Sequence, residues 1–155
     1  MKEQKDIKKK VAVIFPGIGY HTDKSLLYYS KKLAGERAYE IIEVKYGELP
    51  TGVKGNAKKM REAFALTLQY ATEQLAAVCF ADYEEVLFIS KSVGTAVAAA
   101  YAASRHIQAR QIYYTPVAES FEAITQEGIV FHGTADPWAD TAVIQAECEK
   151  QNLPL

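Results

Sequence analysis

Short apolar runs alternate with longer amphipathic stretches along this chain, and the alternation restricts the fold more than any other feature. The runs span residues 11–15, 39–44, 86–89, 112–114 and 129–132. Such runs, flanked by glycine, proline and polar residues, are typical of β-strands buried on both faces of a sheet. Because parallel strands need a crossover between them, strands that alternate with helices predict an α/β fold with a parallel sheet.

The segments between the runs show helical periodicity. The clearest stripe recurs every three or four residues and consists of Met60, Phe64, Leu68, Ala71, Leu75 and Val78. Other helices are expected over residues 24–34, closed by Gly35, and over 93–105 and 138–151. Since βαβ crossovers are right-handed, we expect a three-layer α/β/α sandwich with a doubly wound, mostly parallel sheet of about five strands.

Length and composition fit one domain over residues 1–155, of which 1–10 form a lysine-rich leader. The 18 basic and 19 acidic residues give a net charge of −1, which argues against a broad nucleic-acid-binding surface. No stretch approaches the roughly 18 apolar residues of a membrane span. Cys79 and Cys148 form no C-x-x-C pair, so we expect neither a metal site nor a disulfide, and we expect a cytoplasmic location. We also expect no cofactor.

Three of the expected strands end in loops whose residues suggest chemistry. They are Pro16-Gly17-Ile18-Gly19-Tyr20 after the first strand, Ser90-Lys91-Ser92-Val93-Gly94 after the third and Gly133-Thr134-Ala135-Asp136 after the fifth. Ligand sites of open parallel sheets lie at the carboxyl ends of the strands. We therefore expect a glycine turn, a serine and an aspartate to converge on one edge of the sheet.

Ser92 lies where a buried strand turns sharply into an alanine-rich helix. Such a turn holds its central residue in a strained conformation and lifts the side chain over the sheet edge. Gly94 lets the helix fold back on the strand, and the free Val93 amide at the helix start can stabilise an anion beside the Ser92 hydroxyl. The alternative interpretation is that Ser92 is only a helix N-cap.

The first loop supplies the expected binding residues Gly17, Ile18, Gly19 and Tyr20. Its glycines allow the Ile18 amide to act as a second oxyanion donor. Tyr20 either lines an acyl pocket or is a rim aromatic. A phosphate-binding loop is disfavoured, because the third glycine of G-x-G-x-x-G and a G-K-[ST] motif are missing. Asp136 is either a buried carboxylate that orients an imidazole or a turn aspartate.

On these three motifs the chain resembles the α/β-hydrolase superfamily, in a small form similar to dienelactone-hydrolase-like and acyl-ester hydrolases. The resemblance implies a serine hydrolase of small-molecule esters or thioesters. Ser92 would form the acyl-enzyme and Asp136 would be the triad acid. The resemblance also implies that the backbone around Ile18 and Val93 would hold the oxyanion.

The family places its catalytic histidine after the acid, but no histidine follows Asp136 in this chain. We therefore expect a hydrolase shortened at its carboxyl end and weakly active. His21 is a weaker candidate base, His132 is expected to be structural, and His106 should lie at the opposite edge. Lys91 should point away from Ser92 as a solvated charge.

A missing last strand would leave the fifth strand unpaired and favour a homo-oligomer formed through this exposed sheet edge. Two other functions stay open from the sequence. One is a non-catalytic binding module that keeps the hydrolase fold, and the other is a flavodoxin-like nucleotide or flavin binder.

Overall fold

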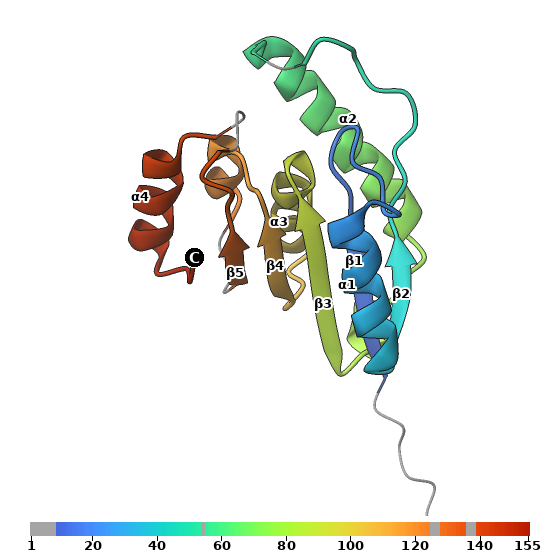
Figure 1. The fold of residues 1–155 in the computed structure, drawn as a ribbon. Coiled ribbons are helices and arrows are strands. Elements are labelled where there is room, and N and C mark those ends of the chain that lie inside the picture. The colour runs from blue at the N-terminus through green and yellow to red at the C-terminus, as the bar shows by residue number, and fades with distance from the viewer. Residues whose placement is uncertain (1–8, 54, 125–127, 136–138) are drawn as a thin grey trace, which may run out of the picture.

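The computed structural model describes residues 9–53, 55–124, 128–135 and 139–155, and Figure 1 shows their arrangement. The strands are β1 (Lys10–Phe15), β2 (Tyr39–Glu43), β3 (Glu85–Lys91), β4 (Arg110–Tyr114) and β5 (Gly128–Phe131). The α-helices are α1 (Ser25–Glu36), α2 (Ala57–Leu75), α3 (Val93–Ser104) and α4 (Thr141–Gln151), and the short 3₁₀ helices are η1 (Phe80–Asp82) and η2 (Ala118–Glu122).

The five strands form one parallel sheet in the order β2-β1-β3-β4-β5, as the alternation of the sequence predicts. Their register brings the strand ends to one level. Phe15 of β1 lies opposite Ser90 of β3, and Tyr114 of β4 lies opposite both Lys91 and Phe131. The loops after β1, β3, β4 and β5 therefore begin side by side at one edge, which we call the carboxyl edge.

Helices cover both faces of the sheet, so the predicted three layers are confirmed (Figure 1). On one face α2 and α3 pack over β1 and β3, and α3 and α4 pack over β4 and β5. On the other face α1 inserts Leu27 against Ile14 and Ile89. Phe15 and Phe88 are fully buried, with ring centroids 5.0 Å apart.

The ends of two helices differ from the sequence expectation. Gly35 does not close α1, which continues to Glu36 before the chain turns at Ala38 with φ of 66°. The closing turn therefore uses a non-glycine residue in the left-handed region. The last helix begins at Thr141 rather than near residue 138, because the Asp140 carboxylate caps it by accepting from the Ala142 and Val143 amides.

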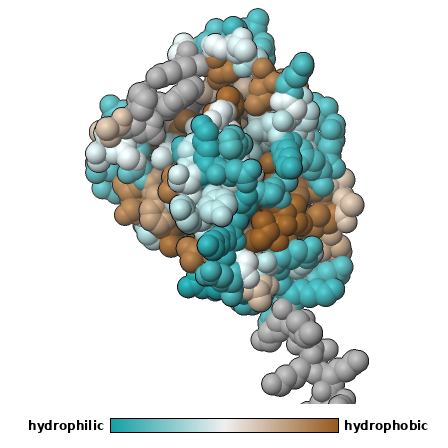
Figure 2. Space-filling view, turned by 45° about the vertical axis from the view of Figure 1, so that its right-hand side comes forward, coloured by the Kyte–Doolittle hydropathy of each residue, from teal (hydrophilic) through white to brown (hydrophobic). Residues whose placement is uncertain are grey.

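The surface is largely hydrophilic but carries apolar patches, as the face in Figure 2 shows. The large apolar side chains that are exposed among the described residues are Leu26, Tyr28, Tyr29, Leu33, Ile129, Phe131, Val143 and Leu155. Within the described segments, no helix combines the length and the apolar character that a membrane crossing requires.

Candidate active site

The strand-to-helix turn at Ser92 has the strained geometry that the sequence predicts. Ser92 has φ of 53° and ψ of −122°, a combination that a serine rarely adopts. Its amide donates to the Tyr114 carbonyl at 2.9 Å, and its carbonyl accepts from the Thr95 amide and hydroxyl at 3.0 and 2.7 Å. Ser92 occupies the N-cap position of α3, but its side chain makes no capping hydrogen bond there, so the structure gives no support to a capping role of its hydroxyl.

The first turn of α3 is fixed from its buried side. The Thr95 hydroxyl lies 2.7 Å from the Ser120 hydroxyl of η2, and both side chains are buried. Thr95 thus ties the Ser92 carbonyl to the segment that follows β4. These hydrogen bonds hold the strained backbone of the turn, because a left-handed serine persists only where its surroundings enforce it.

Two glycines allow the loop after β1 to lie directly against this turn. A Cβ on Gly94 would come within 2.4 Å of the Pro16 carbonyl oxygen and 2.5 Å of the Phe15 carbonyl oxygen. A Cβ on Gly17 would lie 3.2 Å from the Ser92 Cβ. The backbone of the β1 loop therefore passes beside the serine, as an oxyanion loop must.

The loop itself is a tight turn with a free tip. Gly17 and Tyr20 exchange backbone hydrogen bonds of 3.2 and 3.3 Å, which leaves Ile18 and Gly19 at the tip. Among the described residues, neither the Ile18 amide nor the Val93 amide donates to another group of the protein. Both amides thus have no described hydrogen-bond partner, and the amino end of α3 adds a partial positive charge at the Val93 amide.

Two tyrosines and a lysine brace the same loop. The hydroxyl of Tyr46 donates to the Pro16 carbonyl at 2.7 Å, and burial raises the pKa of this phenol well above its ordinary value. The Tyr20 hydroxyl accepts from the Leu26 amide at 2.9 Å, which joins the loop to α1. Lys24 donates to the Gly19 carbonyl at 2.7 Å. The loop is thus held from α1, from the residue before it and from the long segment after β2.

Lys91 is not the solvated charge that the sequence suggests. Its ammonium donates to the Thr115 hydroxyl at 2.6 Å and lies 4.7 Å from the centroid of the Tyr20 ring. Thr115 follows β4 with φ of 46° and donates its amide to Phe131 at 2.6 Å. Sequence reasoning missed Thr115 and Tyr46, since neither belongs to a motif and only the fold brings them to this edge.

The three histidines lie in different surroundings. His21 is exposed, and its Nδ1 accepts from the Asp23 amide at 3.3 Å within its own turn. His132 follows β5 and pairs its Nε2 with the Thr141 hydroxyl at 2.9 Å, while its Nδ1 is buried without a described partner. His106 follows α3 at the amino edge of the sheet, as expected.

The predicted acid, Asp136, lies outside the described residues, so the structure does not test its role. His132 and Gly133 place the beginning of its loop beside Thr115, at the same edge as Ser92. Within the described ranges, no group of three or more histidine, cysteine, aspartate or glutamate side chains could hold a metal ion.

No protein-family model and no curated protein matches the sequence, whereas solved structures match the fold. A protein of Xanthomonas campestris pv. campestris assigned to the hydrolases of the α/β superfamily superposes with a TM-score of 0.70 at 14% identity, over 96% of this chain and 84% of that one. Est1E of Butyrivibrio proteoclasticus, solved with ferulic acid bound, gives a TM-score of 0.68 at 12% identity, over 100% and 81%.

Esterase 2 of Thermogutta terrifontis, solved after phosphoramylation by tabun, gives a TM-score of 0.56 at 18% identity, over 96% of this chain and 70% of that one. The solved structures that match this chain thus include proteins described as hydrolases and esterases. Three observations point to the same fold: the five parallel strands, the left-handed serine after β3 and these superpositions. The chain has the fold of the α/β-hydrolase superfamily.

Proposed function

We propose that this protein is a serine hydrolase that cleaves esters or thioesters of small acyl groups, with the Ser92 hydroxyl as nucleophile. The observation that carries the proposal is the left-handed conformation of Ser92 between β3 and α3. Its side chain makes no capping hydrogen bond, and the glycine loop after β1 lies directly beside it. The hydrolase and esterase structures of the same fold support this reaction class. The esterase that tabun phosphoramylates supports an organophosphorus probe as the test.

In the proposed reaction the Ser92 oxygen attacks the acyl carbon, and its proton passes to solvent water, which also supplies the proton to the leaving group. The carbonyl oxygen becomes an oxyanion, which the Ile18 and Val93 amides bind. The carbon–oxygen or carbon–sulfur bond then breaks, and the alcohol or thiol leaves with a proton. Water hydrolyses the acyl-serine and returns the free hydroxyl. Preorganised amides of this kind lower the barrier because they need no reorientation as charge develops.

We propose that no histidine of this chain is the catalytic base, and that Asp136 is the acid of an incomplete triad. Among the described residues no hydrogen bond joins Ser92 to a histidine: His21 accepts within its own turn, His132 pairs with Thr141, and His106 lies at the other edge. A site without its base keeps roughly 10³–10⁴-fold catalysis over water from the oxyanion hole and substrate binding. Activity of the 155-residue chain should therefore be low.

A second candidate follows from the strand order. The order β2-β1-β3-β4-β5 is also that of flavodoxin-like sheets, which bind flavin at the switch point between the first and third strands. Here that switch point is occupied by the loop after β1 and the Ser92 turn. Flavin absorbance in the purified protein would favour this binder over the hydrolase.

The expected surroundings of the enzyme are part of the proposal. We propose small-molecule substrates, with no nucleic-acid or membrane partner, and a cytoplasmic location. Both cysteines are free thiols, and Cys148 is buried, which supports a reducing compartment.

The test is covalent labelling of the purified chain by a fluorophosphonate, read by mass spectrometry of the modified peptide. We expect slow labelling at Ser92 that is abolished in Ser92→Ala. Ser104→Ala is the matched control, because Ser104 ends the same helix at the amino edge. Equal labelling of Ser92→Ala would disprove the nucleophile.

The pH dependence of the labelling rate tests the missing base. Without a histidine base the rate should rise steadily with pH, as the alkoxide fraction rises. A rate that levels off above a pKa near 6.5, and that His21→Ala or His132→Ala lowers, would show that a histidine of this chain is the base.

A further inference from the structure

The two faces of the sheet are covered unequally. Among the described residues, three helices pack on one face, whereas α1 alone packs on the other, over β1 and β3. In the described structure the part of that face over β4 and β5 remains open, and Ile129 and Phe131 are 46% and 50% exposed there. Parallel sheets are almost always buried on both faces, so we expect another element to pack on this surface.

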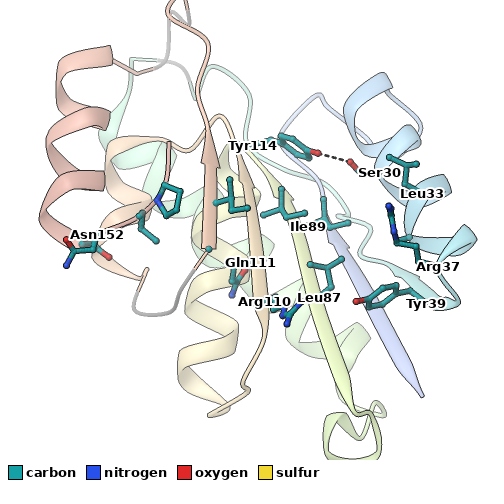
Figure 3. A pocket seen from close by; sticks show the side chains of 17 residues that line it. Ser30, Leu33, Arg37, Tyr39, Leu87, Ile89, Arg110, Gln111, Tyr114 and Asn152 are labelled. Atoms are coloured by element: carbon teal, nitrogen blue, oxygen red, sulfur yellow. Dashed lines mark hydrogen bonds between the residues drawn. The ribbon is translucent and has the colours of Figure 1, made fainter. Parts of the chain in front are cut away.

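The open part of the face forms a groove of about 910 Å³ between α1 and the segment at 151–154 (Figure 3). Its floor is apolar and comes from Leu87, Ile89, Ile112 and Ile129. It extends from β3 to β5, two strand spacings or about 10 Å, which is the width of one α-helix. One helix laid along the strands would fill it.

One end of the groove is basic. Arg37 and Arg110 line it near the amino edge of the sheet, where the Tyr39 hydroxyl donates to Glu85 at 2.7 Å. None of the described residues that line the groove is acidic. A helix that fits the groove should therefore be apolar along its length and carry a carboxylate where it reaches the arginines.

The outer surface of α1 has this pattern. Leu26, Tyr29 and Leu33 follow one another at helical spacing and are 42%, 61% and 53% exposed. Glu36 continues the stripe three residues later and is exposed at the carboxyl-terminal end of the helix. The chain thus exposes both an apolar helix ending in a carboxylate and, beside it, a groove ending in two arginines.

We propose that two copies of this chain form a twofold dimer in which α1 of each copy lies in the groove of the other. A twofold axis parallel to the strands keeps both α1 helices running in the same direction, side by side between the two sheets. Glu36 of one copy then reaches the Arg110 end of the other copy's groove, and the same contact recurs by symmetry. Such an isologous contact closes on itself and forms no filament.

This dimer uses the face of the sheet rather than the edge expected from the sequence. The edge of β5 is already partly occupied, because the Val130 amide donates to the Pro154 carbonyl at 2.9 Å. The dimer does not depend on the proposed hydrolase activity, so either proposal can fail alone.

The first experiment measures mass by light scattering and sedimentation at micromolar concentration. We expect twice the 17.2 kDa of one chain. Glu36→Arg and Arg110→Glu should each weaken the dimer at least about tenfold, because like charges then meet in both symmetric contacts. The double variant should restore it. A monomeric wild-type chain, or a dimer that none of these changes affects, would overturn the proposal.

The second experiment tests the contact directly, in a Cys79→Ser background that removes the exposed thiol. Leu33→Cys should form a disulfide-linked dimer on mild oxidation, because Leu33 lines the groove into which the second α1 fits. Tyr28→Cys is the control, since Tyr28 is exposed on the other side of the same helix. Equal cross-linking of both variants, or cross-linking of Tyr28→Cys alone, would contradict the geometry.

Discussion

The carboxyl edge of the sheet is tightly packed around β1 and β3 and open around β5. On the first side Phe15, the last residue of β1, is fully buried, and Gly94 has no room for a Cβ. On the other side Phe131 is half exposed, and a Cβ on Gly133 would meet nothing within 4 Å. The strained Ser92 lies on the packed side, and this indicates that the surrounding packing holds its backbone in the unusual conformation.

The comparison extends to two phenylalanines of the sheet, Phe88 in the middle of β3 and Phe131 at the end of β5. Phe88→Ala should lower the free energy of unfolding by about 3–5 kcal/mol, because a large ring leaves a buried cavity. Phe131→Ala should cost about 1.5 kcal/mol or less, since half of that ring already contacts solvent. Urea unfolding followed by circular dichroism measures both. Similar losses for the two variants would show that the sides are packed alike.

A pair of glycines tests the same difference at the backbone. Gly94→Ala should destabilise the fold by about 1–3 kcal/mol, since the new methyl group overlaps the Phe15 and Pro16 carbonyls. It should also reduce fluorophosphonate labelling, because the β1 loop must move away from Ser92. Gly133→Ala should leave both unfolding and labelling unchanged, and a marked effect there would contradict an open β5 side.

Sequence reasoning went far for the fold and less far for the site. The strands were predictable because a parallel strand buried on both faces reads as an apolar run, as in residues 86–89. The Ser92 turn was predictable because small residues must follow it. The roles of Tyr46 and Thr115 were not, since each depends on a partner that is distant in sequence, Pro16 and Lys91. Lys91 was misjudged for the same reason.

Tyr46 offers a smaller test of how the packed side is braced. Tyr46→Phe removes the hydrogen bond to Pro16 and should lower the free energy of unfolding by about 1 kcal/mol. If the β1 loop serves as the oxyanion loop, labelling of Ser92 should slow as well. Tyr28→Phe is the control, because Tyr28 is 44% exposed and lies outside the proposed dimer contact. A stability loss without any change in labelling would show that the hydroxyl supports the fold but not the site.

The smallest expected effect concerns the ion pairs that join α1 to β2 beside the packed side. Lys31 bonds Glu43 and Asp23, which lowers the pKa of the Glu43 carboxyl below 4.5 and raises the pKa of Lys31 above 10.5. The Glu43 contribution is therefore complete above pH 4.5 and is lost as pH falls through the lowered pKa. Glu43→Gln should cost less than about 1 kcal/mol at pH 7, because the pair is partly exposed and Asp23 remains, and it should cost less at pH 3 than at pH 7. Urea unfolding at both pH values, with the exposed Glu62→Gln on α2 as control, measures the difference. A loss at pH 3 as large as at pH 7 would mean that Glu43 acts through packing rather than through its charge.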